Sequence, residues 1–208
     1  MPGTNAAMGP HTTLLRKVLR RLRERANTTL VSDSTGARLN GREVLLRALV
    51  LRRLLRRRLA ADERNVGVLL PPTVAGVVTN LALALDKRVA VNLNYSLTPE
   101  LIRHSIKEAG IRHAITSRAF LERLSVDLVP AQPIVLEDLG KQATRLDKAL
   151  AAAGAYMPVA LLERWLGITR IPADAPMAII FTSGSAGWPK GVVLPWRSIE
   201  ANTGMVDA

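Results

Sequence analysis

The chain has 208 residues, 48% of them hydrophobic and 22% charged, which is enough for one core of ordinary size or two small ones. It has no cysteine, which excludes a disulfide scaffold, a thiolate zinc site and a cysteine nucleophile. Its three histidines are scattered without metal-ligand spacing, so we expect no metal site. The net charge is +12, but residues 1–60 hold 14 of the 29 basic residues and only 3 of the 17 acidic ones.

Two stretches with helical periodicity carry this local charge. Residues 11–25 repeat apolar side chains at helical spacing with six basic side chains between them, and residues 42–59 combine a broad apolar face with an arginine cluster. Such helices either pack on a core with their arginines in water, or lie on an anionic membrane or along phosphates. We favour core packing for the second helix and leave membrane-surface contact open for residues 11–25. Nucleic acid is the less expected partner, because the basic excess is local.

The N-terminal segment does not have the continuous apolar core of a secretory signal, so we expect a cytoplasmic location, with the inner face of a membrane as an alternative. The longest uncharged run, residues 65–85, is long enough to span a membrane. However, Pro71 and Pro72 divide it, and Asn80 lies in the remainder. We therefore interpret this run as a buried strand at residues 66–70, a proline turn, and a helix at residues 73–85.

Strands and helices alternate from residue 60 onward. Further strands are predicted at residues 88–91, 113–116 and 134–136, and further helices after Pro99, at residues 118–124 and at residues 142–152. Thr98 is expected to cap the helix that Pro99 begins, and Gly110 to end it. Strands separated by helices of this length pair in parallel with right-handed crossovers. The predicted fold class is therefore α/β, a parallel sheet flanked by helices.

The composition along the chain predicts four segments. These are a basic N-terminal helix (residues 1–28), a first α/β subdomain (29–152), a connector (153–176), and the start of a second subdomain (177–208). The connector is expected to contain a short helix near residues 159–166. The last segment begins with an apolar strand, continues through a small-residue loop into another apolar strand, and enters a helix near Arg197.

The loop between the apolar strands at residues 177–181 and 192–194 has the parts that hold a polyphosphate. Its glycines let the backbone approach closely, its hydroxyls donate to phosphate oxygens, and Lys190 supplies a positive charge. A flexible hairpin tip has the same composition, so that alternative stays open. The loop is not a Walker A motif, because Pro189 stands where the second glycine belongs and Gly191 where Ser or Thr should follow. The first strand is also not followed by a dinucleotide-binding G-x-G-x-x-G.

The loop and its surroundings resemble a known family. The run Phe181-Thr182-Ser183-Gly184-Ser185-Ala186-Gly187-Trp188-Pro189-Lys190-Gly191-Val192 resembles the phosphate-binding signature of adenylate-forming (AMP-binding) enzymes, which include acyl-CoA synthetases, luciferases and peptide-synthetase adenylation domains. Landmarks at residues 33–36, 66–71 and 90–100 agree, so the resemblance covers roughly residues 30–208. Residues 94–95 and 115–121 are most similar to the acyl-acyl-carrier-protein synthetase part of 2-acylglycerophosphoethanolamine acyltransferases, and thus to long-chain acyl-CoA synthetases.

This resemblance implies an ATP-dependent acid–thiol ligase that uses ATP and Mg²⁺. A carboxylic acid, a fatty acid in the subfamily named, would be activated as an acyl-adenylate and transferred to CoA or an acyl-carrier protein, with lysophospholipid reacylation as an implied role. The resemblance places the ATP phosphates on Thr182, Ser183, Gly184, Ser185, Ala186, Gly187 and Lys190. Ala186 departs from the Thr or Glu usual in the family. Trp196 stands where the family usually has His and is a candidate for the acyl pocket, with an ordinary packed aromatic as the alternative.

The family places its adenine-binding, ribose-binding and Mg²⁺-binding segments, and its C-terminal catalytic lysine, after the point where this chain ends. We therefore expect an N-terminal part of such an enzyme, with no assigned catalytic residue and no adenylation activity by itself. Two alternatives remain: a non-catalytic truncated relative that keeps the ATP loop, or a basic membrane- or nucleic-acid-binding protein that uses residues 11–58.

Overall fold

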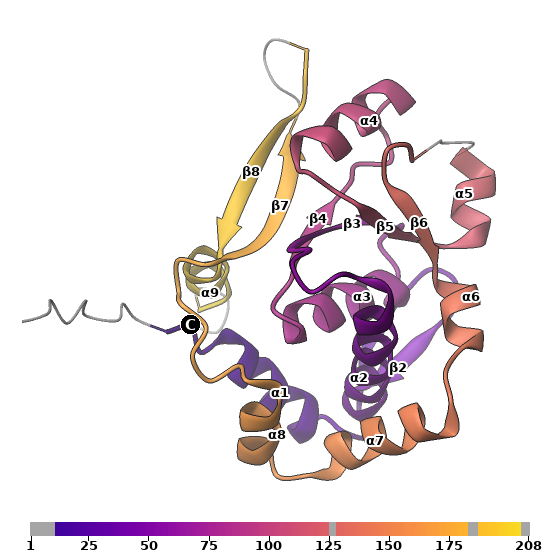
Figure 1. Ribbon diagram of the computed structural model, residues 1–208. Coiled ribbons are helices and arrows are strands. Elements are labelled where there is room, and N and C mark those ends of the chain that lie inside the picture. Colours follow the sequence, from indigo (N-terminus) through magenta and orange to yellow (C-terminus); the bar gives the residue numbers. More distant parts are fainter. Residues whose placement is uncertain (1–10, 125–127, 183–186, 205–208) are drawn as a thin grey trace, which may run out of the picture.

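The structure is a computed structural model that describes residues 11–124, 128–182 and 187–204 (Figure 1). Within these ranges the chain forms nine helices: α1 (Leu14–Glu24), α2 (Gly41–Arg58), α3 (Val74–Leu85), α4 (Pro99–Glu108), α5 (Arg118–Leu124), α6 (Leu136–Lys141), α7 (Arg145–Tyr156), α8 (Val159–Leu166) and α9 (Trp196–Gly204). The same ranges contain eight strands: β1 (Thr29–Ser32), β2 (Arg38–Asn40), β3 (Asn65–Leu69), β4 (Val89–Asn92), β5 (His113–Thr116), β6 (Gln132–Val135), β7 (Pro176–Thr182) and β8 (Lys190–Pro195).

Among the described residues, six strands form one sheet in the order β6-β5-β3-β4-β7-β8. The five strands from β6 to β7 pair in parallel, and β8 pairs antiparallel with β7 at the edge. Strands β1 and β2 form a separate antiparallel hairpin. The predicted α/β fold with a mostly parallel, helix-flanked sheet is therefore confirmed.

The helices cover both faces of the sheet because the strand order reverses. Helix α3 connects β3 to β4, and α4 then leads back past β3 to β5, which places α3 and α4 on opposite faces when both crossovers are right-handed. Apolar side chains of α4 and α5 pack with Leu69 and Val91 on one face. On the other face α2 lies against α3, and α1 and α7 pack against α2 as an outer layer (Figure 1).

Local signals set the ends of several helices as predicted. The Thr98 hydroxyl accepts a hydrogen bond from the Leu101 N–H at 3.5 Å, and Pro99 occupies the first turn of α4. Gly110 adopts a φ of +61° just after this helix, a conformation that L side chains rarely take. Both predictions of capping and termination are therefore confirmed. Helix α2 begins with a capping box in which Asn40 and Glu43 bond to each other's backbone N–H.

The predicted bounds were wrong at β6 and at α7, and one hairpin was not predicted. Strand β6 ends at Val135, so Leu136 begins the short helix α6 instead of ending a strand. Helix α7 begins at Arg145 rather than residue 142, because Thr144 and Asp147 form a capping box there. The hairpin of β1 and β2 was not predicted; its strands are short and mostly exposed, and thus give no alternating apolar pattern.

The arginines of α2 are held mainly by buried carboxylates. Arg52 lies 3.1 Å and Arg56 3.5 Å from Asp86. Arg53 lies 3.1 Å from Asp147, which is fully buried and also pairs with Arg57. Hydrogen bonds from Thr144 and from these two arginines hold the pKa of Asp147 well below its usual range, against the opposing effect of burial. The apolar side chains of this second basic helix lie in the main core, so its predicted core packing is confirmed. The expectation that its arginines lie in water was wrong for Arg52, which is buried against Asp86.

Helix α1 also uses its apolar side inside the fold. Its buried residues are Leu14, Leu15, Leu19 and Leu22. They belong to the same core as α2, and α1 contacts both α2 and α8. The apolar face on which a membrane contact by residues 11–25 would depend is thus buried, and its exposed side carries basic residues. In the described part of the chain, no helix has both the length and the apolar character needed to cross a bilayer.

Candidate functional site

The predicted phosphate loop connects the two strands of an edge hairpin. Ile180 pairs with Val192, Phe181 with Gly191, and Thr182 with Lys190. Thr182 and Lys190 are therefore cross-strand neighbours at the point where the loop opens, at the carboxyl end of β7 (Figure 1). Both residues are exposed. Ser183, Gly184, Ser185 and Ala186 lie outside the described residues.

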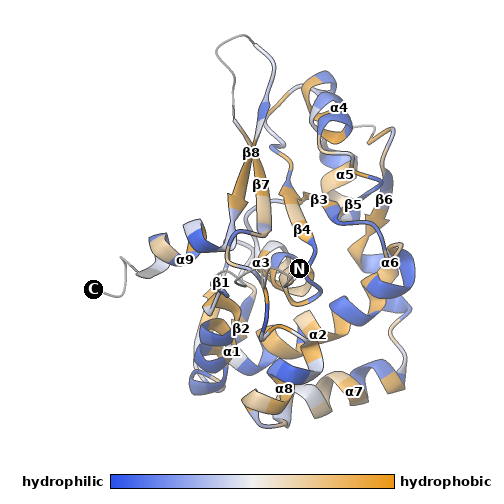
Figure 2. Ribbon diagram, turned by 60° about the vertical axis from the view of Figure 1, so that its left-hand side comes forward, coloured by the Kyte–Doolittle hydropathy of each residue, from blue (hydrophilic) through white to orange (hydrophobic). Residues whose placement is uncertain are grey.

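The strands that carry this loop are apolar, whereas its two flanking site residues are polar. Figure 2 shows hydrophobic residues along much of β7 and β8. Phe181 is buried at 5% exposure and packs with the side chains of α4, which anchors β7 one residue before Thr182. The sheet thus provides a fixed base from which Thr182 and Lys190 face solvent.

The second half of the loop has a defined conformation set by Gly187 and Trp188. Gly187 has a φ of +87°, which an L side chain rarely adopts, so a glycine is needed at this position. The Trp188 ring lies 4.8 Å from the ring of His104 on α4, tilted by 48°. This contact ties the loop to α4. Sequence reasoning did not single out His104, because no local pattern links a helix residue to a loop eighty positions later.

Lys190 has no ion-pair partner among the described residues, and its side chain is exposed. Its charge is therefore available to an anion placed over the loop. Charge-assisted hydrogen bonds from an ammonium to phosphate oxygens are about twice as strong as neutral ones. Thr182 and Lys190 thus lie opposite each other at the hairpin end, with Gly187 three residues before Lys190, and their contact with phosphate stays a prediction.

A hollow of about 690 Å³ lies at the carboxyl ends of β3 and β4. Asn92 pairs in register with Ile180 of β7, so this hollow adjoins the strand that leads to the loop. The amides of Asn80 and Asn92 line it and hydrogen bond to each other at 3.2 and 3.3 Å. Neutral donors and acceptors therefore lie next to the cationic hairpin end.

Trp196 lies at the other end of the hairpin. Pro176 pairs with Pro195, so Trp196 is separated from Thr182 by the length of β7. Its side chain is 2% exposed and belongs to the main core, and its backbone N–H donates to the Ala175 carbonyl at 3.1 Å. The structure thus shows a packed aromatic at this position, and an acyl-pocket role for Trp196 stays a prediction.

Comparison with known proteins places these features in a family. A family model described as "AMP-binding enzyme" matches residues 18–207. The chain belongs to the AMP-binding enzyme family. Phosphinothricin tripeptide synthetase PhsC of Streptomyces viridochromogenes is 32% identical over 141 residues, which are 68% of this chain and 12% of that protein. CymA of Salinispora arenicola, a probable non-canonical nonribosomal peptide synthetase, is 30% identical over 170 residues, 81% of this chain and 2% of that protein.

The solved structures show the same fold. VinN in complex with 3-methylaspartate matches with a TM-score of 0.72 and 21% identity, over 96% of this chain and 51% of that one. This AMP-binding chain thus spans about half of VinN and a small part of the two synthetases. Because both of these sequence relatives are peptide synthetases, the finer resemblance to acyl-acyl-carrier-protein synthetases is not confirmed.

AMP-binding enzymes use ATP and Mg²⁺. The described residues contain no group of three His, Asp or Glu side chains placed to hold a metal ion. Mg²⁺ prefers oxygen ligands, with carboxylates among them. We therefore assign none of the described side chains to Mg²⁺.

Proposed function

We propose that this chain supplies the ATP-phosphate-binding hairpin of an AMP-binding enzyme that activates a carboxylic acid and transfers its acyl group to a thiol. The observation that carries the proposal is the register of β7 and β8, which sets Thr182 opposite Lys190 at the opening of a loop rich in glycine and serine. An exposed ammonium without a partner among the described residues, opposite Thr182 and at the end of a loop whose sequence is rich in glycine and serine, suits a triphosphate.

The reaction has two steps. In the first, a carboxylate oxygen attacks the α-phosphorus of ATP, the bond from that phosphorus to the bridging oxygen of the β-phosphate breaks, and pyrophosphate leaves. In the second, a thiol sulfur attacks the carbonyl carbon of the acyl-adenylate, the bond from that carbon to the AMP oxygen breaks, AMP leaves, and the thiol proton passes to solvent. Negative charge grows on the pyrophosphate during the first step.

The residues of the hairpin act on that first step. Thr182 and the loop hydroxyls of Ser183 and Ser185 would donate to the β- and γ-phosphate oxygens, and Gly184, Ala186 and Gly187 would contribute backbone N–H groups. Lys190 would neutralise charge on the leaving pyrophosphate. Groups that are held in place before the reaction stabilise a growing charge without reorganisation, so their effect is electrostatic and positional.

The substrate and acceptor are finer parts of this proposal. The names of the relatives support an amino acid or similar small carboxylate, and a carrier-protein thiol as acceptor, whereas the resemblance at residues 94–95 and 115–121 supports a fatty acid and CoA or acyl-carrier protein. We take the small carboxylate as the substrate class, because these relatives share 30–32% identity with the chain.

ATP–pyrophosphate exchange by the protein purified from its source cells tests the proposal. Exchange should depend on an added carboxylate, with amino acids and aryl acids tried beside decanoate and palmitate. Lys190→Ala in the same protein should reduce exchange by at least tenfold, while Lys141→Ala, an exposed lysine on α6, should leave it unchanged. Exchange that is equal in both variants would contradict the role of Lys190, and exchange with fatty acids alone would overturn the choice of substrate class.

A further inference from the structure

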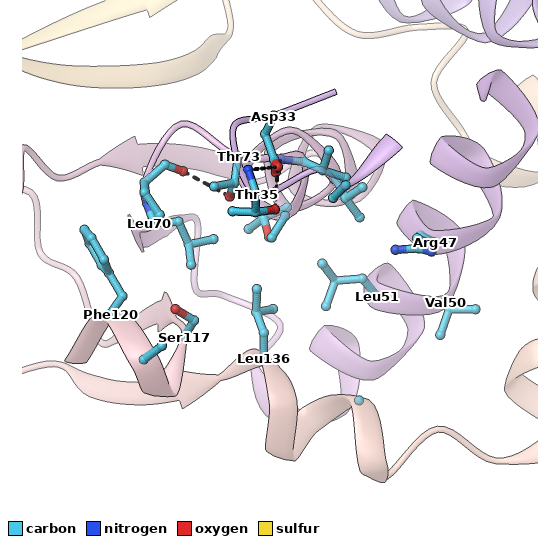
Figure 3. A pocket seen from close by; sticks show the side chains of 18 of the residues that line it. Asp33, Thr35, Arg47, Val50, Leu51, Leu70, Thr73, Ser117, Phe120 and Leu136 are labelled. Carbon is cyan, nitrogen blue, oxygen red and sulfur yellow. Dashed lines mark hydrogen bonds between the residues drawn. The ribbon is translucent and has the colours of Figure 1, made fainter. Parts of the chain in front are cut away.

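A cavity separate from the phosphate hairpin lies at the carboxyl ends of β3 and β5, whose following helices pack on opposite faces of the sheet. Strands β3 and β5 are neighbours, but β3 leads into α3 on one face and β5 into α5 on the other. The carboxyl ends of two such strands leave a crevice, the usual place for ligands in open α/β sheets. In this chain the crevice is a cavity of about 870 Å³ (Figure 3). Cavities of 300–1,000 Å³ are typical of small-molecule sites.

The walls of this cavity are mostly apolar side chains from different elements. Helix α2 contributes Val50 and Leu51, the end of β3 contributes Leu70, and the segments after β5 and β6 contribute Phe120 and Leu136 (Figure 3). Such walls favour a ligand with a hydrocarbon or aromatic body, because its transfer from water contributes about 25 cal/mol for each Å² of apolar surface buried.

Three basic side chains stand around this apolar space. Arg47 on α2, Arg123 on α5 and Lys148 on α7 line the cavity, and all three residues are exposed. None of them has an ion-pair partner within residues 11–124, 128–182 and 187–204. This contrasts with Arg52, Arg53, Arg56 and Arg57 of α2, which are paired with buried carboxylates.

The one acidic side chain among the described residues of the lining is already engaged. Asp33 accepts a hydrogen bond from the Val74 N–H at 2.8 Å, at the start of α3, and its other oxygen accepts from the Thr35 N–H at 2.9 Å (Figure 3). Hydrogen bonds from the Thr35 side chain and the Val74 backbone lower the pKa of Asp33, so it stays charged at neutral pH. With one carboxylate against three cations, the lining residues that the structure describes carry a net charge of about +2.

We infer that this cavity binds an organic anion with an apolar body, whose hydrocarbon or aromatic part lies against α2, β3 and α5 and whose carboxylate lies among Arg47, Arg123 and Lys148. The apolar walls and the net positive lining together select this class over neutral and cationic amphiphiles. The site shares no residue with the phosphate hairpin, so it is independent of the proposed adenylation function.

Calorimetric titration of the 208-residue chain with decanoate, below its micellar concentration, tests this inference. Decanoate should bind saturably at one site per chain, and decylamine, which has the same chain length and the opposite charge, should bind at least tenfold more weakly. The triple variant Arg47→Ala, Arg123→Ala, Lys148→Ala removes only exposed side chains, so it should fold normally and weaken decanoate binding about tenfold. The matched control is Arg25→Ala, Arg103→Ala, Arg170→Ala, which loses the same charge away from the cavity.

The control triple should change decanoate affinity by less than twofold. Equal weakening by both triples would show a general charge effect and overturn the site. Equal binding of decanoate and decylamine, or the absence of saturable binding, would also overturn it. Amide chemical shifts measured in the same titrations should change most near Leu70, Ser117 and Leu136, and changes centred on the β7–β8 hairpin instead would contradict the location.

Discussion

Thr79 offers a test of the packing energetics, because its hydroxyl is buried without a hydrogen bond. The side chain, on α3, is 0% exposed, and Oγ1 has no partner in the described part of the chain. Thr79→Val keeps the shape and replaces the hydroxyl with a methyl group. An unpaired buried hydroxyl costs about 1–3 kcal/mol, and an added buried methyl contributes about 0.8 kcal/mol. We therefore expect the variant to be more stable by about 2–4 kcal/mol.

Urea unfolding followed by tryptophan fluorescence measures this change as a higher midpoint with an unchanged slope, and the thermal midpoint should rise by roughly 4–16 °C. Thr12→Val is the matched control: Thr12 is also buried, at 3% exposure, but its hydroxyl donates to Glu200 at 2.7 Å. That variant should lose about 1–2 kcal/mol. A Thr79→Val protein that is less stable than the parent, or as destabilised as Thr12→Val, would refute the reasoning.

Three further predictions concern the hairpin and its supports. Burial opposes the charge of Glu200, but hydrogen bonds from Thr13 and Thr12 outweigh this effect and lower its pKa to about 2. The stabilising effect of the Glu200 carboxylate is therefore complete above about pH 4.5 and is lost as the pH falls toward 2. In urea unfolding, the loss of stability between pH 6 and pH 3 should be about 1 kcal/mol smaller in Glu200→Gln than in the parent protein. Trp196→Ala should cost about 3–5 kcal/mol in the same assay, and an unchanged stability would speak against the packed role. Gly187→Ala places a side chain at a φ of +87° and should weaken ATP binding in calorimetry by about tenfold, with no change meaning that the turn is not needed.

Much of the sheet could be predicted because its signals are local. The strand at β5 and the helices α5 and α8 have the predicted bounds, and Thr98, Pro99 and Gly110 mark the start and end of α4 through capping and backbone preferences alone. Parallel pairing followed from the alternation of strands and helices. The β1–β2 hairpin escaped prediction because its short, mostly exposed strands have no alternating apolar pattern, although Asp33 and Gly36 between them are typical turn residues.

Sequence patterns predicted the site residues that are close together in the chain, but not the contacts between segments far apart in the sequence. The composition of the loop identified Thr182, Gly187 and Lys190, since glycine, hydroxyls and a lysine between two strands are a local pattern. The contact of His104 with Trp188 depends on the packing of α4 beside the hairpin. The cavity at the ends of β3 and β5 likewise combines residues from the β1–β2 turn to α7, and no sequence window contains them. The ion pairs of the α2 arginines with Asp86 and Asp147 also join residues far apart in the sequence, so no local pattern predicts them.

Binding of inorganic tripolyphosphate to the 208-residue chain tests the central claim most directly, because it requires the hairpin and neither substrate nor acceptor. Calorimetry at low ionic strength should show saturable binding that weakens as salt is added, and AMP should bind far more weakly than tripolyphosphate or ATP. Lys190→Ala should weaken tripolyphosphate binding at least tenfold, and Lys141→Ala should not change it. Equal affinities in the parent and Lys190→Ala proteins would contradict the claim that this hairpin holds the phosphates of ATP.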